Sequence, residues 1–382
     1  MLNTSFTSWP LFSEEEANAV QSVLLSNKVN YWTGNECREF EKEFAVWSNS
    51  KYAIALGNGT LALDSALKAL DIGFGNEVIV TSRTYIASVT SIVTAGAIPV
   101  FADIDTNSQN ITTTSIRSMI TKKTKAIICV HLAGWPCEMD EIIELANEFN
   151  LYVIEDCAQA HGAKYKSKPV GSIGNIGCWS FCQDKIMTTG GEGGMVTTND
   201  KESHNLVHAF MNVGRAPDGA RWEYPRLGWN YRPSEYLAAL LLVRLEKLEE
   251  QTDIRNQNAA YLFNELKQIE GITPPKLESW VTKHGYHLYM MKYNAGGFGE
   301  KPRSEFLSAL NAEGIPCSSG YGSPLSKEGG IKRVAELYPE IIKEFPCPNT
   351  ERVCAESVWL FQNILLGSRS DMDDIVEAIA KI

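Results

Sequence analysis

Between residues 52 and 154 the chain alternates short β-rich runs with longer stretches that repeat apolar residues at helical spacing. The β-rich runs are 52–56, 77–80, 98–101, 126–130 and 151–154. In a parallel sheet a helix carries the chain back from the end of one strand to the start of the next. The alternation therefore predicts an α/β fold, in which helices cover both faces of a mostly parallel central sheet.

The length of the chain and its C-terminal pattern predict a second domain. A chain of 382 residues exceeds the usual size of one hydrophobic core. A long helical pattern begins at Pro233 and continues toward Leu266, and short strand-like and helical runs follow it. We expect N-terminal helices and a large domain over residues 1–250, and a smaller C-terminal α+β domain over residues 251–382.

Charge and cysteine content limit what the protein binds. The net charge of −11 opposes a nucleic-acid or anionic membrane surface. No apolar run approaches the roughly 18 residues that span a bilayer, and the N-terminus does not resemble a signal peptide. Nine cysteines without a C-x-x-C pair argue against zinc and against a disulfide framework. We expect a cytoplasmic protein with small-molecule partners.

Two histidines on one predicted helix face raise the question of a metal site. His204 and His208 have the i, i+4 spacing of metal ligands on a helix. No carboxylate or cysteine pattern accompanies them. A pair of surface histidines is the simpler interpretation, and we expect no metal.

A lysine beside a glycine-rich run and a carboxylate at a strand end indicate cofactor chemistry. Lys185 precedes the run Gly-Gly-Glu-Gly-Gly at 190–194, and Asp156 follows the strand 151–154. A lysine that forms a Schiff base with pyridoxal phosphate needs a carboxylate elsewhere, because the ring withdraws electrons only while its nitrogen is protonated. We therefore predict that Lys185 supplies the amine and Asp156 the carboxylate, as in an aminotransferase.

A phosphate site is predicted at the start of a helix. Gly59 and Thr60 follow the first strand and begin a helical run. The N-terminus of a helix offers free N–H groups and the positive end of the helix dipole to an anion. In parallel sheets, ligands bind at the carboxyl ends of the strands, where Gly59, Thr60 and Asp156 all fall. These residues can therefore converge on one crevice.

Four separate motifs resemble those of the DegT/DnrJ/StrS sugar aminotransferases in their order and spacing. The motifs lie at 57–63, 155–162, 180–194 and 229–232, and the resemblance extends over about residues 10–365. It implies a fold-type I enzyme that depends on pyridoxal 5′-phosphate. It also implies an obligate homodimer with active sites built from both subunits, and L-glutamate or glutamine as the donor of an amino group to a keto sugar.

The resemblance also assigns roles to individual residues. Lys185 holds the cofactor and then moves a proton as general acid and base. Gln159 contacts the ring hydroxyl, and Tyr85 stacks on the pyridine ring. Ser180 contacts the phosphate within its own chain, and Asn230 reaches the phosphate from the partner subunit. Without the resemblance, the last three would be a core tyrosine, a strand-end hydroxyl and a turn asparagine.

The sequence departs from the family pattern at places that face the substrate. Cys182-Gln183 replaces the usual His-Pro or Tyr-Pro before the lysine, and Arg83 replaces a common apolar residue. An arginine two residues from Tyr85 can pair with a carboxylate through two hydrogen bonds. The alternative is a salt-bridged arginine that orders the loop.

Two further residues are predicted to contact the substrate. Tyr321 lies in the segment 319–324, which replaces a His-Tyr loop of the family. His161 follows Gln159 by two residues, so it either lines the site or is a core histidine. We predict Arg83, His161 and Tyr321 as substrate contacts.

These departures resemble one group within the family, the 8-amino-3,8-dideoxyoctulosonate aminotransferases. The resemblance implies a free substrate that carries a carboxylate, 8-oxo-3-deoxy-octulosonate, used for bacterial surface-polysaccharide or lipopolysaccharide biosynthesis. A nucleotide-linked 3- or 4-keto-6-deoxyhexose is the alternative. Two other classes stay open: a sugar dehydratase, against which Lys185 argues because that enzyme has histidine there, and a regulator that binds the cofactor without turnover.

Overall fold

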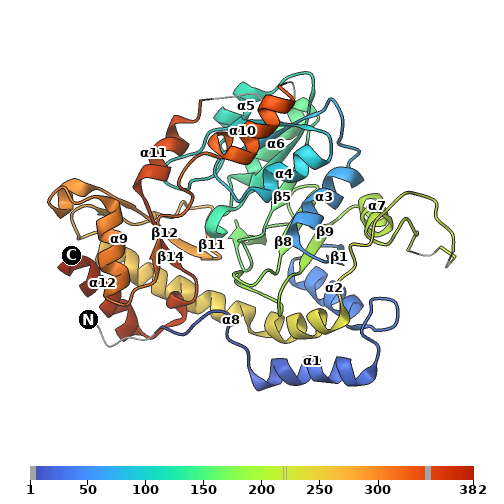
Figure 1. The fold of residues 1–382 in the computed structure, drawn as a ribbon, viewed down its shortest axis with the longest axis horizontal. Helices are drawn as coiled ribbons and strands as arrows, with labels where there is room; N and C mark the ends of the chain where they lie inside the picture. Colours follow the sequence, from blue (N-terminus) through green and yellow to red (C-terminus); the bar gives the residue numbers. More distant parts are fainter. Residues whose placement is uncertain (1–5, 218, 221, 340–345) are drawn as a thin grey trace.

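The computed structural model describes residues 6–217, 219–220, 222–339 and 346–382. The described residues pack around two main apolar cores, and the 32-residue helix α8 (Glu235–Leu266) contributes to both. Figure 1 shows α8 passing beneath the large sheet and continuing into the small domain.

The large sheet has seven strands in the order β1-β9-β8-β5-β4-β2-β3. In chain order they are β1 (Tyr52–Leu56), β2 (Glu77–Thr81), β3 (Ile98–Ala102), β4 (Thr124–Val130), β5 (Tyr152–Asp156), β8 (Ile176–Ser180) and β9 (Gly194–Thr198). Five neighbouring strands from β3 to β8 pair in parallel. Among the described strands of this sheet, only β9 runs against the others. The predicted α/β fold with a mostly parallel sheet is confirmed.

Burial explains the composition of the strands. Val78, Ile79 and Val80 of β2 are fully buried, and β3, β8 and β9 are buried along their whole length. Strands that are covered on both faces read as continuous apolar and β-branched runs. The strand ends then carry the polar residues, including Asp156 at the end of β5.

Helices cover the large sheet and connect its strands. They are α2 (Glu36–Trp47), α3 (Gly59–Ala69), α4 (Ala87–Thr94), α5 (Thr113–Met119), α6 (Met139–Phe149) and α7 (Lys201–Met211). A capping box begins α1 (Glu14–Ser26): Glu16 N–H donates to the Ser13 hydroxyl, and the Glu16 carboxylate accepts the Ser13 N–H. Helix α1 packs along α8 (Figure 1).

The small domain is built on an antiparallel sheet. Its strands are β10 (Ile272–Thr273), β12 (Leu288–Tyr293), β13 (Cys317–Ser318) and β14 (Ser357–Phe361), in the order β10-β12-β14-β13. Helices α9 (Arg303–Ala312) and α12 (Arg369–Lys381) add Phe306, Leu310 and Ile375 to its core. A separate small sheet joins β6 (Lys164–Tyr165), β7 (Lys168–Pro169) and β11 (Val281–Lys283).

The chain returns to the large domain near its C-terminal end. Helix α10 (Gly329–Leu337) places Ile331 in the large core, and α11 (Pro348–Glu356) then leads into β14. The boundary expected at residue 250 falls inside α8, whose first half packs on the large core and whose second half packs on the small one. In the part of the chain that the structure describes, the helices are too short or too polar to cross a membrane.

Candidate active site

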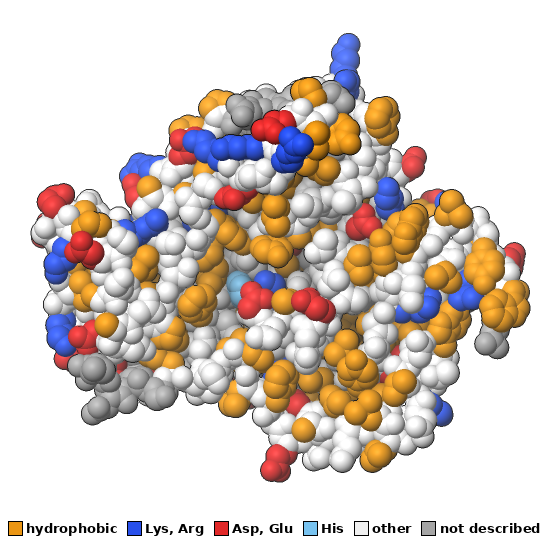
Figure 2. Space-filling view, in the orientation of Figure 1, with side chains coloured by type: hydrophobic (Ala, Val, Ile, Leu, Met, Phe, Trp, Pro, Cys, Tyr) orange, Lys and Arg blue, Asp and Glu red, His pale blue; other side chains and the backbone are white. Residues whose placement is uncertain are grey.

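A cleft of about 1050 Å³ lies between the large and the small domain. Predicted residues that line it are Gly59, Thr60, Tyr85, Asp156, Gln159, Ser180, Lys185 and Tyr321. The small domain adds His287, Trp359 and Gln362. Figure 2 shows this face hollowed near the middle, where acidic, basic and histidine side chains lie together. Residues far apart in the sequence therefore meet in one site.

One end of the cleft can bind an anion. Asn58 caps α3, since its side chain accepts the N–H of Leu61 and its carbonyl accepts that of Ala62. Within the described part of the chain, the amides of Gly59 and Thr60 donate no backbone hydrogen bond. The hydroxyl of Ser180 lies opposite them at the end of β8. Free amides at a helix start together with a hydroxyl form a phosphate site.

Two glycines allow the close approach at this anion site. A Cβ on Gly59 would lie 2.6 Å from the Cβ of Ser180, and a Cβ on Gly194 would lie 2.2 Å from the carbonyl oxygen of Asn58. Both distances are far shorter than real contacts, so a side chain at either position would push α3 away from β8 and β9. The anion site formed by Gly59, Thr60 and Ser180, here called the cradle, fits the phosphate of pyridoxal phosphate.

Asp156 lies at the end of β5 and is 5% exposed. Its Oδ2 accepts a hydrogen bond from the Ser88 hydroxyl at 2.8 Å, and its Oδ1 accepts one from the Ala158 N–H at 3.1 Å. Burial raises the pKa of Asp156 in spite of these hydrogen bonds, which favour the ionised form. A positively charged ring nitrogen in the cleft would restore the balance and hold the carboxylate ionised. Asp156 thus fits the pyridinium role.

Gln159 is fixed with its amide nitrogen toward the cleft. Its Oε1 accepts the N–H of Ala133 at 2.8 Å, and its Nε2 donates to the hydroxyl of Tyr321 at 3.3 Å. The remaining donor of Nε2 can therefore serve a ring hydroxyl. Tyr85 lies just before α4, and its side chain is 62% exposed toward the cleft, where a stacking partner would cover it.

Lys185 pairs with the carboxylate of Asp184, which also lies near the ring of His287. Its Nζ is 3.0 Å from Oδ2 of Asp184, and Nε2 of His287 is 3.8 Å from the same oxygen. Partial burial alone would raise the pKa of Asp184, but the positive charge of Lys185 outweighs it and lowers that pKa. Burial, and then the charge of Lys185, lower the pKa of His287 to about 3. The lysine is therefore the basic group at the centre of the cleft.

Arg83 does not line the cleft, and its side chain is 1% exposed. Its Nε donates to Gln109 at 2.8 Å and its Nη2 to Ser357 at 2.8 Å. Its Nη1 donates to the carbonyl of Tyr321 at 3.2 Å and to the sulfur of Cys354 at 2.9 Å. All three nitrogens serve protein acceptors, so we no longer assign Arg83 to a substrate carboxylate. It orders the Tyr321 loop, through uncharged partners instead of the expected salt bridge.

His161 is fully buried and lies behind the cleft wall. Its ring packs 5.3 Å from the ring of Trp179 and 5.4 Å from that of Phe181. Burial lowers its pKa to about 3, so the imidazole is neutral. This position matches the core histidine that the sequence left open, and not a substrate contact.

Asn230 does not line the cleft of its own chain. It forms an isolated β-bridge with Asn212, and its neighbour Tyr231 donates a hydrogen bond from its hydroxyl to Asp64.

The histidines of the possible metal pair, His204 and His208, lie on α7 with their ring centres 6.4 Å apart. His204 packs on the ring of Tyr52.

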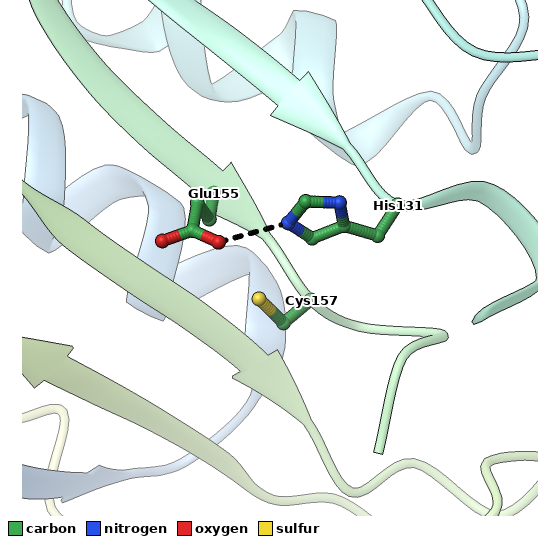
Figure 3. Close-up of side chains that lie close together, drawn as sticks. All are labelled: His131, Glu155 and Cys157. Carbon is green, nitrogen blue, oxygen red and sulfur yellow. Dashed lines mark hydrogen bonds and ion pairs between the residues drawn. The ribbon is translucent and has the colours of Figure 1, made fainter. Parts of the chain in front are cut away.

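A buried cluster of His131, Glu155 and Cys157 adjoins Asp156 (Figure 3). The Glu155 carboxylate accepts Nε2–H of His131 at 3.0 Å and the backbone N–H groups of Gly171, Ile173 and Gly174 at 2.6–2.8 Å. Nδ1 of His131 accepts the N–H of Cys137 at 3.0 Å, which fixes the tautomer. Because the oxygens and both ring nitrogens are already used, we interpret the cluster as a structural network that holds the end of β5, and assign no metal to it.

We expect Glu155→Gln to lower the free energy of unfolding by about 1–3 kcal/mol, the usual cost of leaving buried hydrogen-bond donors unsatisfied, because the amide group has one acceptor oxygen where the carboxylate has two. Burial alone would raise the pKa of Glu155, but His131 and the backbone donors lower it below its usual value. The stabilisation is therefore full above the unfolded carboxyl pKa of about 4.3 and disappears as the pH falls through the folded pKa.

Urea unfolding at pH 7 and at pH 3 measures this effect. The difference between wild type and Glu155→Gln should shrink at the lower pH. Glu148→Gln is the matched control, since Glu148 pairs with Arg117 on the surface at 2.6 Å and should contribute less than about 1 kcal/mol. Equal stability of the two variants at pH 7 would show that the network does not hold β5.

The sequence analysis did not predict several residues that line the cleft. Asp184 adjoins the lysine and could have been considered for its charge alone. Ser88 lies in the first turn of α4, three residues after Tyr85, where its hydroxyl reaches Asp156. His287 and Gln362 carry no motif, and only the docking of the small domain brings them to the cleft.

Known proteins resemble the chain along nearly its whole length. The sequence profile of the DegT/DnrJ/EryC1/StrS aminotransferase family matches residues 10–380. An aminotransferase from Psychrobacter cryohalolentis has a similar structure, with a TM-score of 0.92 and 45% identity over 98% of each chain. The GDP-perosamine synthase of Escherichia coli O157:H7 is 43% identical over 74% of this chain and 75% of that protein.

The dTDP-3-amino-3,6-dideoxy-alpha-D-galactopyranose transaminase of Aneurinibacillus thermoaerophilus is 35% identical over 96% of this chain and 95% of that protein. The anion site at the start of α3, the buried Asp156 and Lys185 line one cleft and fit the cofactor that this family uses. The chain therefore belongs to the DegT/DnrJ/EryC1/StrS aminotransferase family and is a sugar aminotransferase that depends on pyridoxal 5′-phosphate.

Proposed function

We propose that the enzyme transfers an amino group from L-glutamate to a nucleotide-linked 3- or 4-keto-6-deoxyhexose, with Lys185 as the catalytic residue. One observation carries the proposal: the amine of Lys185 opens into the same cleft as the buried Asp156 carboxylate and the amides that begin α3. These are the three contacts that pyridoxal phosphate requires from a protein.

The chain's own residues then divide the work. Bound pyridoxal phosphate supplies an electron sink that makes the Cα–H bond of an amino acid acidic. The amides of Gly59 and Thr60 and the hydroxyl of Ser180 bind its phosphate, and Asp156 keeps its ring nitrogen protonated. Nζ of Lys185 takes the proton from Cα of glutamate in the first half-reaction. In the second half-reaction it gives a proton to the sugar carbon that receives the amino group.

Two contacts orient the ring within the cleft. Nε2 of Gln159 would donate to the ring hydroxyl, and its other partner, the Tyr321 hydroxyl, fixes the direction of that donor. The ring of Tyr85 would cover one side of the cofactor. Lys185 would reach the reacting carbon from one face of the ring, so the proton would move on that face only.

The cleft favours a nucleotide-linked sugar over the free octulosonic acid. The assignment of the free octulosonic acid as substrate depended on Arg83. All three side-chain nitrogens of Arg83 donate to protein acceptors. The volume of about 1050 Å³ lies at the upper end of the range for ligand pockets, enough for a cofactor and an extended substrate. Two relatives are named for GDP- and dTDP-linked sugars.

The octulosonic acid stays the second candidate because Cys182 and Tyr321 occupy the cleft where the sequence departs from the family. A transamination screen separates the two. Wild-type enzyme should transfer the amino group to a GDP- or dTDP-linked keto sugar at least tenfold faster than to 8-oxo-3-deoxy-octulosonate. The reverse order would overturn the nucleotide-linked assignment but leave the aminotransferase mechanism in place.

We further propose a cytoplasmic homodimer that serves surface-polysaccharide or lipopolysaccharide biosynthesis. Its shared active sites receive Asn230 from the partner subunit. Asn230 lies outside its own cleft, and the neighbouring Trp222, Leu227 and Trp229 are 50–87% exposed. A covered surface would bury these apolar side chains. Mixing inactive Lys185→Ala with inactive Asn230→Ala should restore part of the activity through hybrid sites. An active species that sediments as a monomer would contradict the shared site.

A further inference from the structure

The segment of residues 6–13, here called the N-terminal strap, connects the small domain with the lysine loop and α8. Figure 1 shows it as a dark blue trace that runs from the small domain toward the start of α1. Phe6 packs against the core of the small domain, and Nδ2 of Asn363 donates to the carbonyl of Thr7 at 2.8 Å. The first end of the strap is therefore attached to the small domain, beside the cleft that Asn363 lines.

Arg244 on α8 fastens the other end of the strap. Its side chain is 8% exposed, its Nη2 donates to the carbonyl of Leu11 at 2.9 Å, and its Nε lies 2.8 Å from Oε1 of Glu16. The guanidinium carbon is 5.2 Å from the ring centre of Trp9 and 4.8 Å from that of Phe12. A partly desolvated cation over two aromatic rings holds both of them in place.

Trp9 links this strap to the lysine. Its Nε1 donates a hydrogen bond to the backbone carbonyl of Lys185 at 3.0 Å, and its ring lines the cleft. Lys185 lies in the connection between β8 and β9, which forms neither helix nor strand. Its own N–H donates to the carbonyl of Cys182. The position of the lysine backbone thus depends on few hydrogen bonds, and Trp9 makes one of them.

The packing behind Trp9 does not replace that hydrogen bond. A separate hollow of about 170 Å³ lies between Trp9, Ile186, Met187 and Arg244. Ile186 and Met187 are also buried in the large core, so packing anchors the residues that follow Lys185, whereas the Trp9 hydrogen bond holds the Lys185 carbonyl itself.

We propose that Trp9 is a positioning residue for Lys185. The strap, fixed by Arg244 and by the small domain, holds the Lys185 carbonyl and thereby the direction from which its amine enters the cleft. The inference rests on the proposed catalytic role of Lys185. The ring of Trp9 also forms part of the cleft wall, so the test has to separate loss of the wall contact, which changes KM, from loss of the hydrogen bond, which changes kcat.

The test compares Trp9→Phe with Trp47→Phe. Both variants lose an indole N–H that donates a hydrogen bond, but Trp47 donates to Glu249 at 3.2 Å away from the cleft. Trp9→Phe should lower kcat for the glutamate half-reaction by about threefold to tenfold, the range for one lost hydrogen bond, with KM nearly unchanged. The visible circular dichroism of the bound cofactor should weaken as well. Trp47→Phe should keep both the kcat and the dichroism of the wild type.

A second variant tests the anchor. Arg244→Lys keeps a charge for Glu16, but a lysine cannot also bond the Leu11 carbonyl with the same geometry, so it should show the same loss of kcat and dichroism. Wild-type kcat and dichroism in Trp9→Phe, or a change in KM alone, would overturn the positioning role. Full turnover by Lys185→Ala would be a different result, because it would remove the proposed catalytic lysine itself.

Discussion

Replacing Lys185 with alanine should reduce transamination by at least about 10²–10⁴-fold, the usual contribution of a general acid–base group. The loss should exceed that range when covalent attachment of the cofactor also fails. The fold should persist, because the amine faces the cleft and pairs with the carboxylate of its own neighbour Asp184 at 3.0 Å. Initial rates with glutamate and a keto sugar measure the loss, and far-ultraviolet circular dichroism checks the fold.

A matched control is Lys166→Ala. Lys166 pairs with Asp140 on the surface, at 2.6 Å, and lies outside the cleft. Its replacement should leave kcat unchanged within a factor of about two, since exposed ion pairs contribute little. Turnover by Lys185→Ala within tenfold of the wild type would show that another group moves the proton.

Asp156→Asn should slow both half-reactions by about 10²–10³-fold, the loss expected when one preorganised electrostatic contact is removed. A neutral amide cannot keep the pyridine nitrogen protonated, although it fills the same space. The cofactor should still bind through the cradle at Gly59 and Ser180, so absorbance should detect it in the variant. Single-turnover rates with glutamate and with a keto sugar measure the two halves separately.

Ser88→Ala serves as the graded control for Asp156→Asn. It removes the hydrogen bond at 2.8 Å to Oδ2 but keeps the carboxylate, so the rate should fall by about tenfold, and less than in Asp156→Asn. Burial raises the pKa of Asp156, so cofactor affinity in the wild type should weaken as the pH falls through that pKa. Near-normal rates in Asp156→Asn would mean that another carboxylate faces the ring nitrogen.

The sequence predicted the large domain well because its signals are local. Alternating strands and helices, each with its own burial pattern, define the order of elements without reference to distant residues. The run 195–198 is typical of a further strand, but it carries no local signal for the antiparallel direction of β9. It follows β8 through a connection without a helix, so the chain turns back at the same edge of the sheet.

The site residues also differ in how well the sequence predicted them. Gly59, Asp156, Ser180 and Lys185 follow strand ends, and parallel strands bring their carboxyl ends to one edge, so their meeting follows from topology. Arg83 was misjudged because closeness to Tyr85 in sequence does not determine the direction of a side chain. It points away from the cleft toward Gln109 and Ser357.

Contributions from the small domain and the N-terminal strap could not be predicted. His287, Gln362 and Trp9 reach the cleft only because two cores dock on α8 and the strap crosses between them. Such contacts depend on tertiary packing and leave no periodic pattern. The choice of substrate depends on these same cleft-lining side chains. This explains why the sequence alone left the substrate open.

Reduction of the loaded enzyme with borohydride, followed by peptide mass mapping, tests the central claim most directly, because it fixes the cofactor to the amine that holds it. The account predicts one modified peptide, with the added mass of the reduced cofactor on Lys185, and none in Lys185→Ala. The modification of a different lysine in the wild type, with Lys185 unmodified, would contradict it.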